Sequence, residues 1–271
     1  MPAAKARKTG SGARPTAITK LSETPSRGKR NWLIYGPSGC GKTVLAGTAP
    51  NALFCTVETA GTESAKAFGS TADDMPIPTK VDLDEAFEYF RYGTGCKDFE
   101  WVILDSLSEI EETFWAHLQG DRMSQKIQEY GTVGTMIKRE VERWNRLPIN
   151  VIYTAQTMTL TKEDDEGDEY EYTIPSLGTR NGVVSQRIAA KTTLNGLMEV
   201  RVRKNEDNER EEQRRLYLRG TRGFLAKDRH LLAERRGYLI DPSIGAMAEK
   251  ADANSRGVGG SKKKTTTKEN P

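Results

Sequence analysis

The sequence predicts an α/β fold with a mostly parallel sheet, helices on both faces, and antiparallel strands added toward the C-terminal side. Short apolar segments alternate with helical ones between residues 32 and 153, and this alternation is typical of parallel sheets. Trp101–Leu104 contains no polar position, as expected for a strand covered on both faces. After Gln156, charged segments with alternating apolar residues follow, which favours antiparallel strands.

The first half of the chain supplies the parallel strands and the helices between them. Trp32–Tyr35 is the first strand, and a glycine-rich turn leads from it into a helix that begins near Lys42. Asp82, with Glu85 three residues later, has the spacing of a helix N-cap and predicts an amphipathic helix that ends at Tyr92. The other strands expected here are Ala52–Val57, Trp101–Leu104 and Asn150–Tyr153.

A helical stretch and then a long helix are expected between the third and fourth of these strands. Ser106 opens the helical stretch, with Glu109 three residues later. Farther along, apolar residues recur at steps of three, four and their multiples, which indicates one face of a long helix. These residues are Met123, Ile127, Tyr130, Ile137, Val141, Trp144 and Leu147.

The segment after the fourth strand is more polar. Residues 163–171 are mostly acidic, and Tyr170, Tyr172 and Ile174 alternate along the chain, so we expect a hairpin or a mobile loop. The later elements expected from periodicity are a short helix, Val183–Lys191, and two strands, Leu197–Arg203 and Leu216–Arg219.

The two ends of the chain differ in composition from its middle. Residues 1–30 carry eight basic residues and one acidic residue, and residues 249–271 carry six basic and three acidic residues. Both ends are poor in apolar side chains, so neither buries enough surface to fold alone. We therefore predict a disordered basic arm over 1–29, a folded domain over 30–248 and a disordered basic tail over 249–271. Basic arms of this kind either contact nucleic acid or stay solvated.

Composition excludes several classes of function. No apolar run approaches the length of a membrane span, and the opening segment lacks the apolar core of a signal peptide. The three cysteines show no metal-binding or paired spacing, and two histidines are too few for a histidine-rich metal site. These features predict a cytoplasmic protein with reduced thiols and no contact with membranes.

One motif carries most of the functional inference. Residues 36–43 match G-x-x-x-x-G-K-[ST] at every position. A strand is expected before them and a helix after them, so they predict a P-loop that binds ATP. Backbone N–H groups of such a loop surround the phosphates, the ammonium of Lys42 reaches the β- and γ-phosphates, and the hydroxyl of Thr43 binds Mg²⁺. The motif consists of Gly36, Pro37, Ser38, Gly39, Cys40, Gly41, Lys42 and Thr43.

A second motif completes the predicted magnesium site. The apolar strand Trp101–Leu104 ends in Asp105, which is the Walker B pattern. A buried strand holds such a carboxylate rigidly at its carboxyl end, where it can orient Mg²⁺ and its waters. Many strands end in an aspartate, so the pattern gains its weight from the P-loop that precedes it.

Further residues resemble the RecA-like ATPase core. Ser106 stands where an Asp-Glu pair would carry a second acid, so the resemblance assigns the water-activating carboxylate to Glu58, just after the second strand. Thr154-Ala155-Gln156 is similar to the strand end at which a RecA-like polar residue, here Gln156, senses the γ-phosphate. Lys227-Asp228-Arg229 resembles the pair with which RecA-like and KaiC-like rings reach a neighbouring subunit's phosphate. From the residues alone, the alternatives are that Gln156 is an ordinary polar strand end and that the Lys227/Arg229 pair is a solvated turn.

The order of these motifs resembles phage-encoded proteins with a bare RecA-like core, some of them called Sak-type single-strand annealing proteins. The resemblance implies ATP-dependent binding of single-stranded DNA in phage recombination or replication. It also implies a homo-oligomer, either ring or filament, and a possible single-strand-binding protein as partner. Of the two DNA-binding loops of such proteins, the first would lie near residues 117–134, with Arg122, Lys126 and Tyr130, and the second would follow Gln156.

The acidic segment 163–171 departs from that pattern, because a run of carboxylates repels the phosphate backbone. DNA contact would then fall to 157–162, to 179–191 with Arg180, Arg187 and Lys191, or to the basic tails with Arg201, Arg203 and Lys204. The same acidic segment favours an alternative, an ATPase that loads or regulates a protein partner such as a helicase or single-strand-binding protein. A small-molecule kinase is a third possibility, in which the Arg-rich segment 201–222 would form a lid.

Overall fold

The computed structural model describes residues 28–58, 60–120, 127–178, 181–204 and 209–257. Arg122, Lys126 and Arg180, which the sequence offers for DNA contact, lie outside these ranges, as do residues 1–27 and 258–271 of the predicted disordered ends. Within the described part, no helix is both long enough and apolar enough to cross a bilayer.

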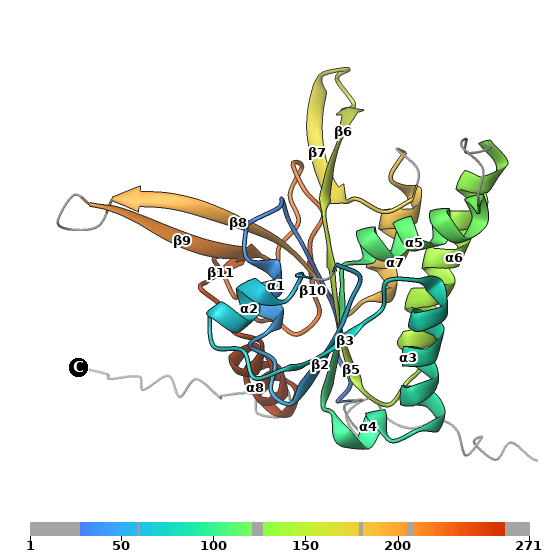
Figure 1. The fold of residues 1–271 in the computed structure, drawn as a ribbon. Helices are drawn as coiled ribbons and strands as arrows, with labels where there is room; N and C mark the ends of the chain where they lie inside the picture. Colours follow the sequence, from blue (N-terminus) through green and yellow to red (C-terminus); the bar gives the residue numbers. More distant parts are fainter. Residues whose placement is uncertain (1–27, 59, 121–126, 179–180, 205–208, 258–271) are drawn as a thin grey trace, which may run out of the picture.

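The core of the fold is a mixed sheet with the strand order β11-β9-β8-β1-β5-β4-β2-β3 (Figure 1). The strands from β8 to β3 are all parallel, which confirms the predicted fold class. The parallel strands are β1 (Asn31–Tyr35), β2 (Ala52–Thr56), β3 (Asp73–Pro76), β4 (Trp101–Asp105), β5 (Asn150–Ala155) and β8 (Leu194–Lys204). Because β5 lies between β1 and β4, the loops after β1 and β4 flank the end of β5.

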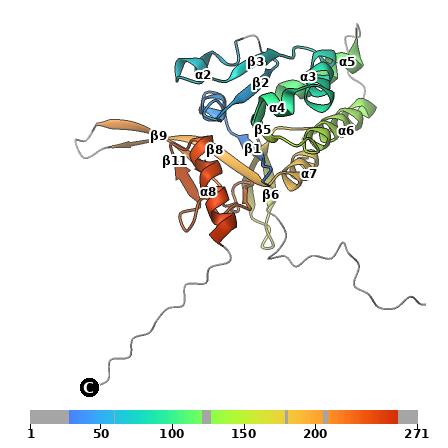
Figure 2. The same cartoon turned by 90° about the horizontal axis from the view of Figure 1, so that it is seen from below.

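Alternate residues of the central strands pack into two separate cores, one on each face. Leu33 of β1 faces a core built with helices α3 (Lys80–Tyr92), α5 (Leu107–Gln119), α6 (Ile127–Trp144) and α7 (Val183–Lys191). Trp32 and Ile34 face a core built with α1 (Lys42–Ala46), α2 (Glu63–Ala67) and α8 (Ile244–Gly257). Figure 2 shows α6 and α7 on the opposite side of the sheet from α8. Burial on both faces explains the unbroken apolar strands.

Helix α3 begins three residues earlier than the sequence analysis predicts. Thr79 is the N-cap of α3: its side chain accepts from the Asp82 backbone N–H, and the Asp82 side chain accepts from the Thr79 backbone N–H. Asp82 is therefore the third helical residue of a capping box, and not the cap itself. At α5 the predicted N-cap is confirmed, because the Ser106 Oγ accepts from the backbone N–H of Glu109 at 3.2 Å.

Three elements between β2 and β4 escape the sequence analysis, namely α2, β3 and α4 (Gly95–Asp98). Helix α2 has five residues, strand β3 is an edge strand with mostly exposed side chains, and α4 is a single turn. None of them carries the apolar periodicity on which prediction from sequence depends.

The hairpin expected after Gln156 is present. Strands β6 (Thr157–Glu163) and β7 (Glu169–Pro175) form a two-stranded antiparallel sheet of their own, which projects from the main sheet in Figure 1. Helix α7 then leads into β8. Strand β8 joins β1 in parallel, and β9 (Arg210–Tyr217) and β11 (Tyr238–Ile240) continue the sheet antiparallel, while the short β10 (Lys227–Asp228) also pairs antiparallel with β8. The antiparallel addition is therefore confirmed, but it begins one strand later than predicted.

The C-terminal boundary of the folded domain also differs from the prediction. Helix α8 extends to Gly257, so residues 249–257, assigned to the tail from their polar composition, are helical. Ile244, Met247 and Ala251 recur at helical spacing and are buried against the core on the α1 side of the sheet. This narrow apolar stripe is enough to hold α8 against the sheet, because α8 packs against the protein on one side only.

Candidate functional site

The glycine-rich loop lies between the buried strand β1 and helix α1. Gly39 and Gly41 have φ values of +75° and +97°, a region that residues with a Cβ rarely adopt. The loop thereby turns back toward the sheet, and the N-terminus of α1, which starts at Lys42, faces the space the loop encloses. Free N–H groups at a helix N-terminus attract anions. The backbone thus has the form a phosphate requires.

Lys42 is almost fully buried beneath this loop, with 7% of its surface exposed. Its Nζ donates to the carbonyl oxygens of Gly36 and Pro37, both at 2.9 Å. Burial lowers the pKa of Lys42, while Cys40 and the nearby Asp105 raise it. An ammonium has three donors, so two contacts to the loop leave one for a phosphate.

A pair of hard oxygen groups lies where the sequence predicts magnesium. The Thr43 Oγ1 donates to Oδ2 of Asp105 at 2.7 Å, and Thr154 at the end of β5 donates to the other carboxylate oxygen. Burial raises the pKa of Asp105, although both hydroxyls and Lys42 oppose the shift. Among the described residues no cluster of three or more His, Cys, Asp or Glu side chains forms an all-protein cage. Mg²⁺ typically uses one or two protein ligands and completes its shell with phosphate and water, so Thr43 and Asp105 fit it.

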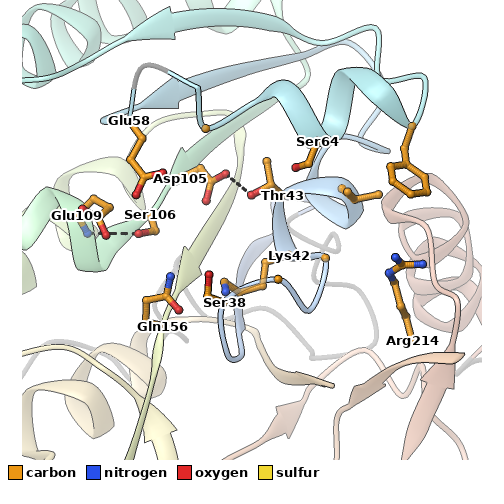
Figure 3. A pocket seen from close by; sticks show the side chains of 15 residues that line it. Ser38, Lys42, Thr43, Glu58, Ser64, Asp105, Ser106, Glu109, Gln156 and Arg214 are labelled. Atoms are coloured by element: carbon orange, nitrogen blue, oxygen red, sulfur yellow. Dashed lines mark hydrogen bonds between the residues drawn. The ribbon is translucent and has the colours of Figure 1, made fainter. Parts of the chain in front are cut away.

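A cavity of about 270 Å³ opens over the loop. Figure 3 shows Glu58, Asp105 and Gln156 on one side of it, with Lys42 and Thr43 in the middle. The structure therefore brings together the predicted sites from the ends of β1, β2, β4 and β5. The cavity is lined by Ser38, Gly39, Gly41, Lys42, Thr43, Val44, Glu58, Gly61, Ser64, Phe68, Asp105, Ser106, Glu109, Gln156 and Arg214.

Several lining residues were not predicted as site residues. Glu109, in the first turn of α5, lies beside Ser106 in Figure 3; burial, followed by the charge of Glu58, raises its pKa. The sequence signal was present, because Glu109 follows the Walker B strand by one helical turn. Arg214 comes from β9 and Phe68 from the end of α2. No local motif marks either residue, so only the folded chain reveals them.

The pair Lys227 and Arg229 does not line this cavity in the same chain. Lys227 begins the short strand β10 (Lys227–Asp228), and its Nζ donates to the carbonyl oxygens of Ala189 and Ala190 at 2.6 and 3.2 Å. These carbonyls are at the C-terminal end of α7, so Lys227 caps that helix. Burial and the charge of Arg229 lower the pKa of Lys227 to about 8. Its action on a neighbouring subunit stays a prediction.

Comparison with known proteins places the chain in a family. A model of an AAA domain matches residues 29–230, which is most of the chain. The chain belongs to the AAA-domain family. Membership of this family confirms the prediction that the chain is a P-loop ATPase. No curated protein matches the sequence, and the resemblance to phage-encoded annealing proteins stays a prediction.

Among solved structures, this AAA-domain protein is similar to a KaiC-like protein from the hyperthermophilic archaeon Pyrococcus horikoshii OT3. The two are 14% identical, with a TM-score of 0.33, over 79% of this chain and 89% of the archaeal one. A likeness of this degree says nothing about substrate or assembly.

The half-buried Asp105 gives a prediction about stability. Because burial raises its pKa, the folded state disfavours the charged form, and this cost is present at pH 7 and fades as the pH falls through the folded pKa. Asp105→Asn should therefore raise the Tm of the nucleotide-free protein at pH 7 by a few degrees, since about 1 kcal/mol shifts a domain of this size by roughly 2–4 °C. The same variant should lose most of the rise in Tm that Mg-ATP gives the wild type.

Thermal unfolding with and without Mg-ATP checks both effects. The exposed Asp165, at the tip of the β6–β7 hairpin, provides the control. Asp165→Asn should change neither the Tm without Mg-ATP nor the Tm with Mg-ATP. A Mg-ATP shift of wild-type size in Asp105→Asn would contradict the assignment of Asp105 to magnesium.

Proposed function

We propose that this AAA-domain protein hydrolyses ATP with Mg²⁺ at the P-loop and couples hydrolysis to the binding of single-stranded DNA in phage recombination or replication. The observation that carries the coupling is the position of Gln156, which lines the nucleotide cavity and also begins the connection to the β6–β7 hairpin.

Different residues around the cavity have different roles in hydrolysis. The P-loop amides and Lys42 bind the β- and γ-phosphates and stabilise the charge that develops on them. Mg²⁺, held by Thr43 and Asp105, would neutralise charge on the β- and γ-phosphate oxygens. Glu58 takes a proton from the attacking water, whose oxygen bonds to the γ-phosphorus as the bond to the β-phosphate oxygen breaks. ADP and phosphate are the products.

Gln156 is held in a closed set of hydrogen bonds at the base of the hairpin. Its backbone N–H donates to the Ser108 Oγ at 3.0 Å, and Ser108 donates to the Ser176 carbonyl at 3.0 Å. The Ser176 N–H in turn donates to the Gln156 carbonyl at 2.7 Å. A shift of Gln156 on loss of the γ-phosphate would therefore move α5 and both strands of the hairpin together. This is the route by which the ATP state would reach a bound partner.

The basic side chains near the projecting strands differ in how they are engaged. Lys191 pairs with Glu142 at 2.9 Å and Arg201 with Glu199 at 2.7 Å, so both charges are partly neutralised. Arg187, Arg203 and Lys204 are exposed. DNA contact is therefore expected at the outer end of β8, at Arg203 and Lys204, rather than at the acidic tip of the β6–β7 hairpin.

The acidic hairpin favours the second candidate function, a loader or regulator that acts on a helicase or a single-strand-binding protein. Its tip carries Glu163, Asp164, Asp165, Glu166, Asp168 and Glu169. Arg222 pairs with Asp164 and stacks 4.4 Å from the centroid of Tyr170, so one basic residue offsets only part of that charge. A basic protein surface would complement this tip, whereas DNA would be repelled. The kinase alternative lacks a lid, because the Arg-rich segment 201–222 includes the end of strand β8 and all of strand β9.

We propose a homo-oligomer, ring or filament, in which Lys227 and Arg229 approach the nucleotide of a neighbouring subunit. Arg229 is exposed, which suits contact with a second copy. Lys227 would first have to leave the carbonyls at the end of α7, so Arg229 is the better placed of the two.

Steady-state ATP hydrolysis with and without single-stranded DNA tests the proposal. At about 50 mM salt we expect DNA to stimulate hydrolysis, and at about 200 mM salt the apparent DNA affinity should fall by tenfold or more, because phosphate contacts release counterions. The double variant Arg203→Ala/Lys204→Ala should weaken DNA affinity. Its matched control, Arg235→Ala/Arg236→Ala, removes two exposed arginines elsewhere and should not. Hydrolysis indifferent to DNA at both salt concentrations would favour the protein-directed loader.

A further inference from the structure

The nucleotide cavity has two chemically different ends. Figure 3 shows Glu58, Glu109 and Gln156 at one end and Arg214 at the other, with Lys42 and Thr43 between them. The carboxylates and Asp105 suit the γ-phosphate, water and magnesium. A nucleotide whose phosphates follow the loop in this direction places its sugar and base toward Ser64, Phe68 and Arg214, which also line the cavity.

Arg214 is fixed in place by its backbone and by the loop. The backbone N–H of Arg214 donates to the Asp241 carboxylate at 3.0 Å, and the backbone N–H of Asp241 donates to the Arg214 carbonyl at 2.8 Å. A Cβ added at Gly41 would lie 2.9 Å from the Arg214 Nε, so the side chain passes directly over the P-loop. Gly41 is therefore needed for this approach as well as for its own backbone conformation.

The polar atoms of Arg214 are not used up within the protein. Its Nε is buried and has no hydrogen-bond partner among the described residues. A buried donor without a partner costs free energy, and a site that receives a ligand is where such a group is tolerated. The guanidinium carbon lies 5.5 Å from the ring centroid of Phe68.

Phe68 is the C-cap of α2, and 66% of its surface is exposed. An exposed aromatic ring that faces a guanidinium at the rim of a nucleotide cavity offers two flat surfaces to a planar ligand. A base between them needs about 7–8 Å, two contacts of roughly 3.5–4 Å each, so the pair must open by about 2 Å. Phe68 has the freedom to do so, because its side chain is mostly in solvent.

We propose that Phe68 and Arg214 form the base-binding subsite, with the nucleobase stacked between the aromatic ring and the guanidinium. This inference rests on the proposed function, since it assigns the base end of the same ATP site. The subsite holds the base by its flat faces, so it adds affinity for nucleosides in general, and the phosphates are bound independently by the loop.

Binding of Mg-ATP and of Mg-tripolyphosphate, which lacks sugar and base, tests the assignment. Phe68→Ala and Arg214→Gln should each weaken ATP binding by roughly 5- to 100-fold, the range for loss of one stacked base contact, and leave tripolyphosphate binding unchanged. Matched controls are Tyr92→Ala, which removes an aromatic ring that is 72% exposed, and Arg210→Gln, which removes an exposed arginine from the same strand. Neither control should alter either affinity.

A fluorescent nucleotide provides a second readout. In Phe68→Trp, the indole should stack on the base of bound 2-aminopurine riboside triphosphate and quench it more deeply than in the wild type, whereas Tyr92→Trp should not. Three outcomes would each overturn the proposal. They are an unchanged ATP affinity in Phe68→Ala, an equal weakening of ATP and tripolyphosphate binding in Arg214→Gln, and no added quenching in Phe68→Trp. The proposed function itself fails differently, if wild-type ATP binding is absent or insensitive to Lys42→Ala.

Discussion

Lys42→Ala should reduce kcat/KM for ATP by at least about 10²–10³-fold, the loss expected when one group that stabilises developing negative charge is removed. The ammonium lies under the loop beside the carbonyls of Gly36 and Pro37, where no exposed lysine can replace it. Steady-state hydrolysis measures the loss in turnover, and titration with a fluorescent ATP analogue measures the loss in nucleotide affinity.

The fold should survive the change. Lys42 is buried and its pKa is lowered by burial, so the folded state already disfavours its charge, and alanine removes that cost. Lys66→Ala is the matched control, because Lys66 is an exposed lysine on α2, close in sequence to Ser64 and Phe68. Hydrolysis near the wild-type rate in Lys42→Ala, with circular dichroism unchanged, would place the chemistry elsewhere.

The part of the site that the sequence predicts is the part that local order defines. The P-loop is one continuous segment, and a buried strand ends in Asp105, so neither depends on long-range geometry. The parallel order β1-β5-β4-β2 then brings the carboxyl ends of these strands to one edge of the sheet. Glu58 and Gln156 were predicted from the resemblance to the RecA-like core, in which each directly follows a recognisable strand.

Arg214 could not be found in this way. It reaches the P-loop because β9 pairs antiparallel with β8 in a register that sets Arg214 opposite Val200. The segment Arg210–Arg215 has too many charges to be recognised as a strand from periodicity. A slip of one residue would turn Arg214 to the other face of the sheet, and the sequence does not fix that register.

The start of α3 illustrates a different limit. Thr79 with Asp82 and Asp82 with Glu85 both have the spacing of a capping box. The choice depends on which residues reach the core: Leu83 and Phe87 are buried, whereas Val81 is exposed. Local pattern alone therefore leaves two equivalent starts, and packing selects one.

Glu58→Gln should lower kcat by about 10²–10⁴-fold, the contribution typical of a general base, and leave nucleotide affinity nearly unchanged. Two carboxylates lie at this end of the cavity, and they differ in surroundings. Glu58 is exposed after β2, where its carboxylate meets water. Glu109 is half-buried in the first turn of α5, and burial together with Glu58 raises its pKa.

Both carboxylates line the cavity, and the role of base is assigned to Glu58 because it is the more exposed to the attacking water, whereas Glu109 is half-buried beside Ser106 (Figure 3). We therefore expect Glu109→Gln to lower kcat by less than about tenfold, and it serves as the matched control for Glu58→Gln in single-turnover hydrolysis. A larger loss in Glu109→Gln than in Glu58→Gln would transfer the role of base to the helix. A small loss in both would mean that the base comes from outside this pair.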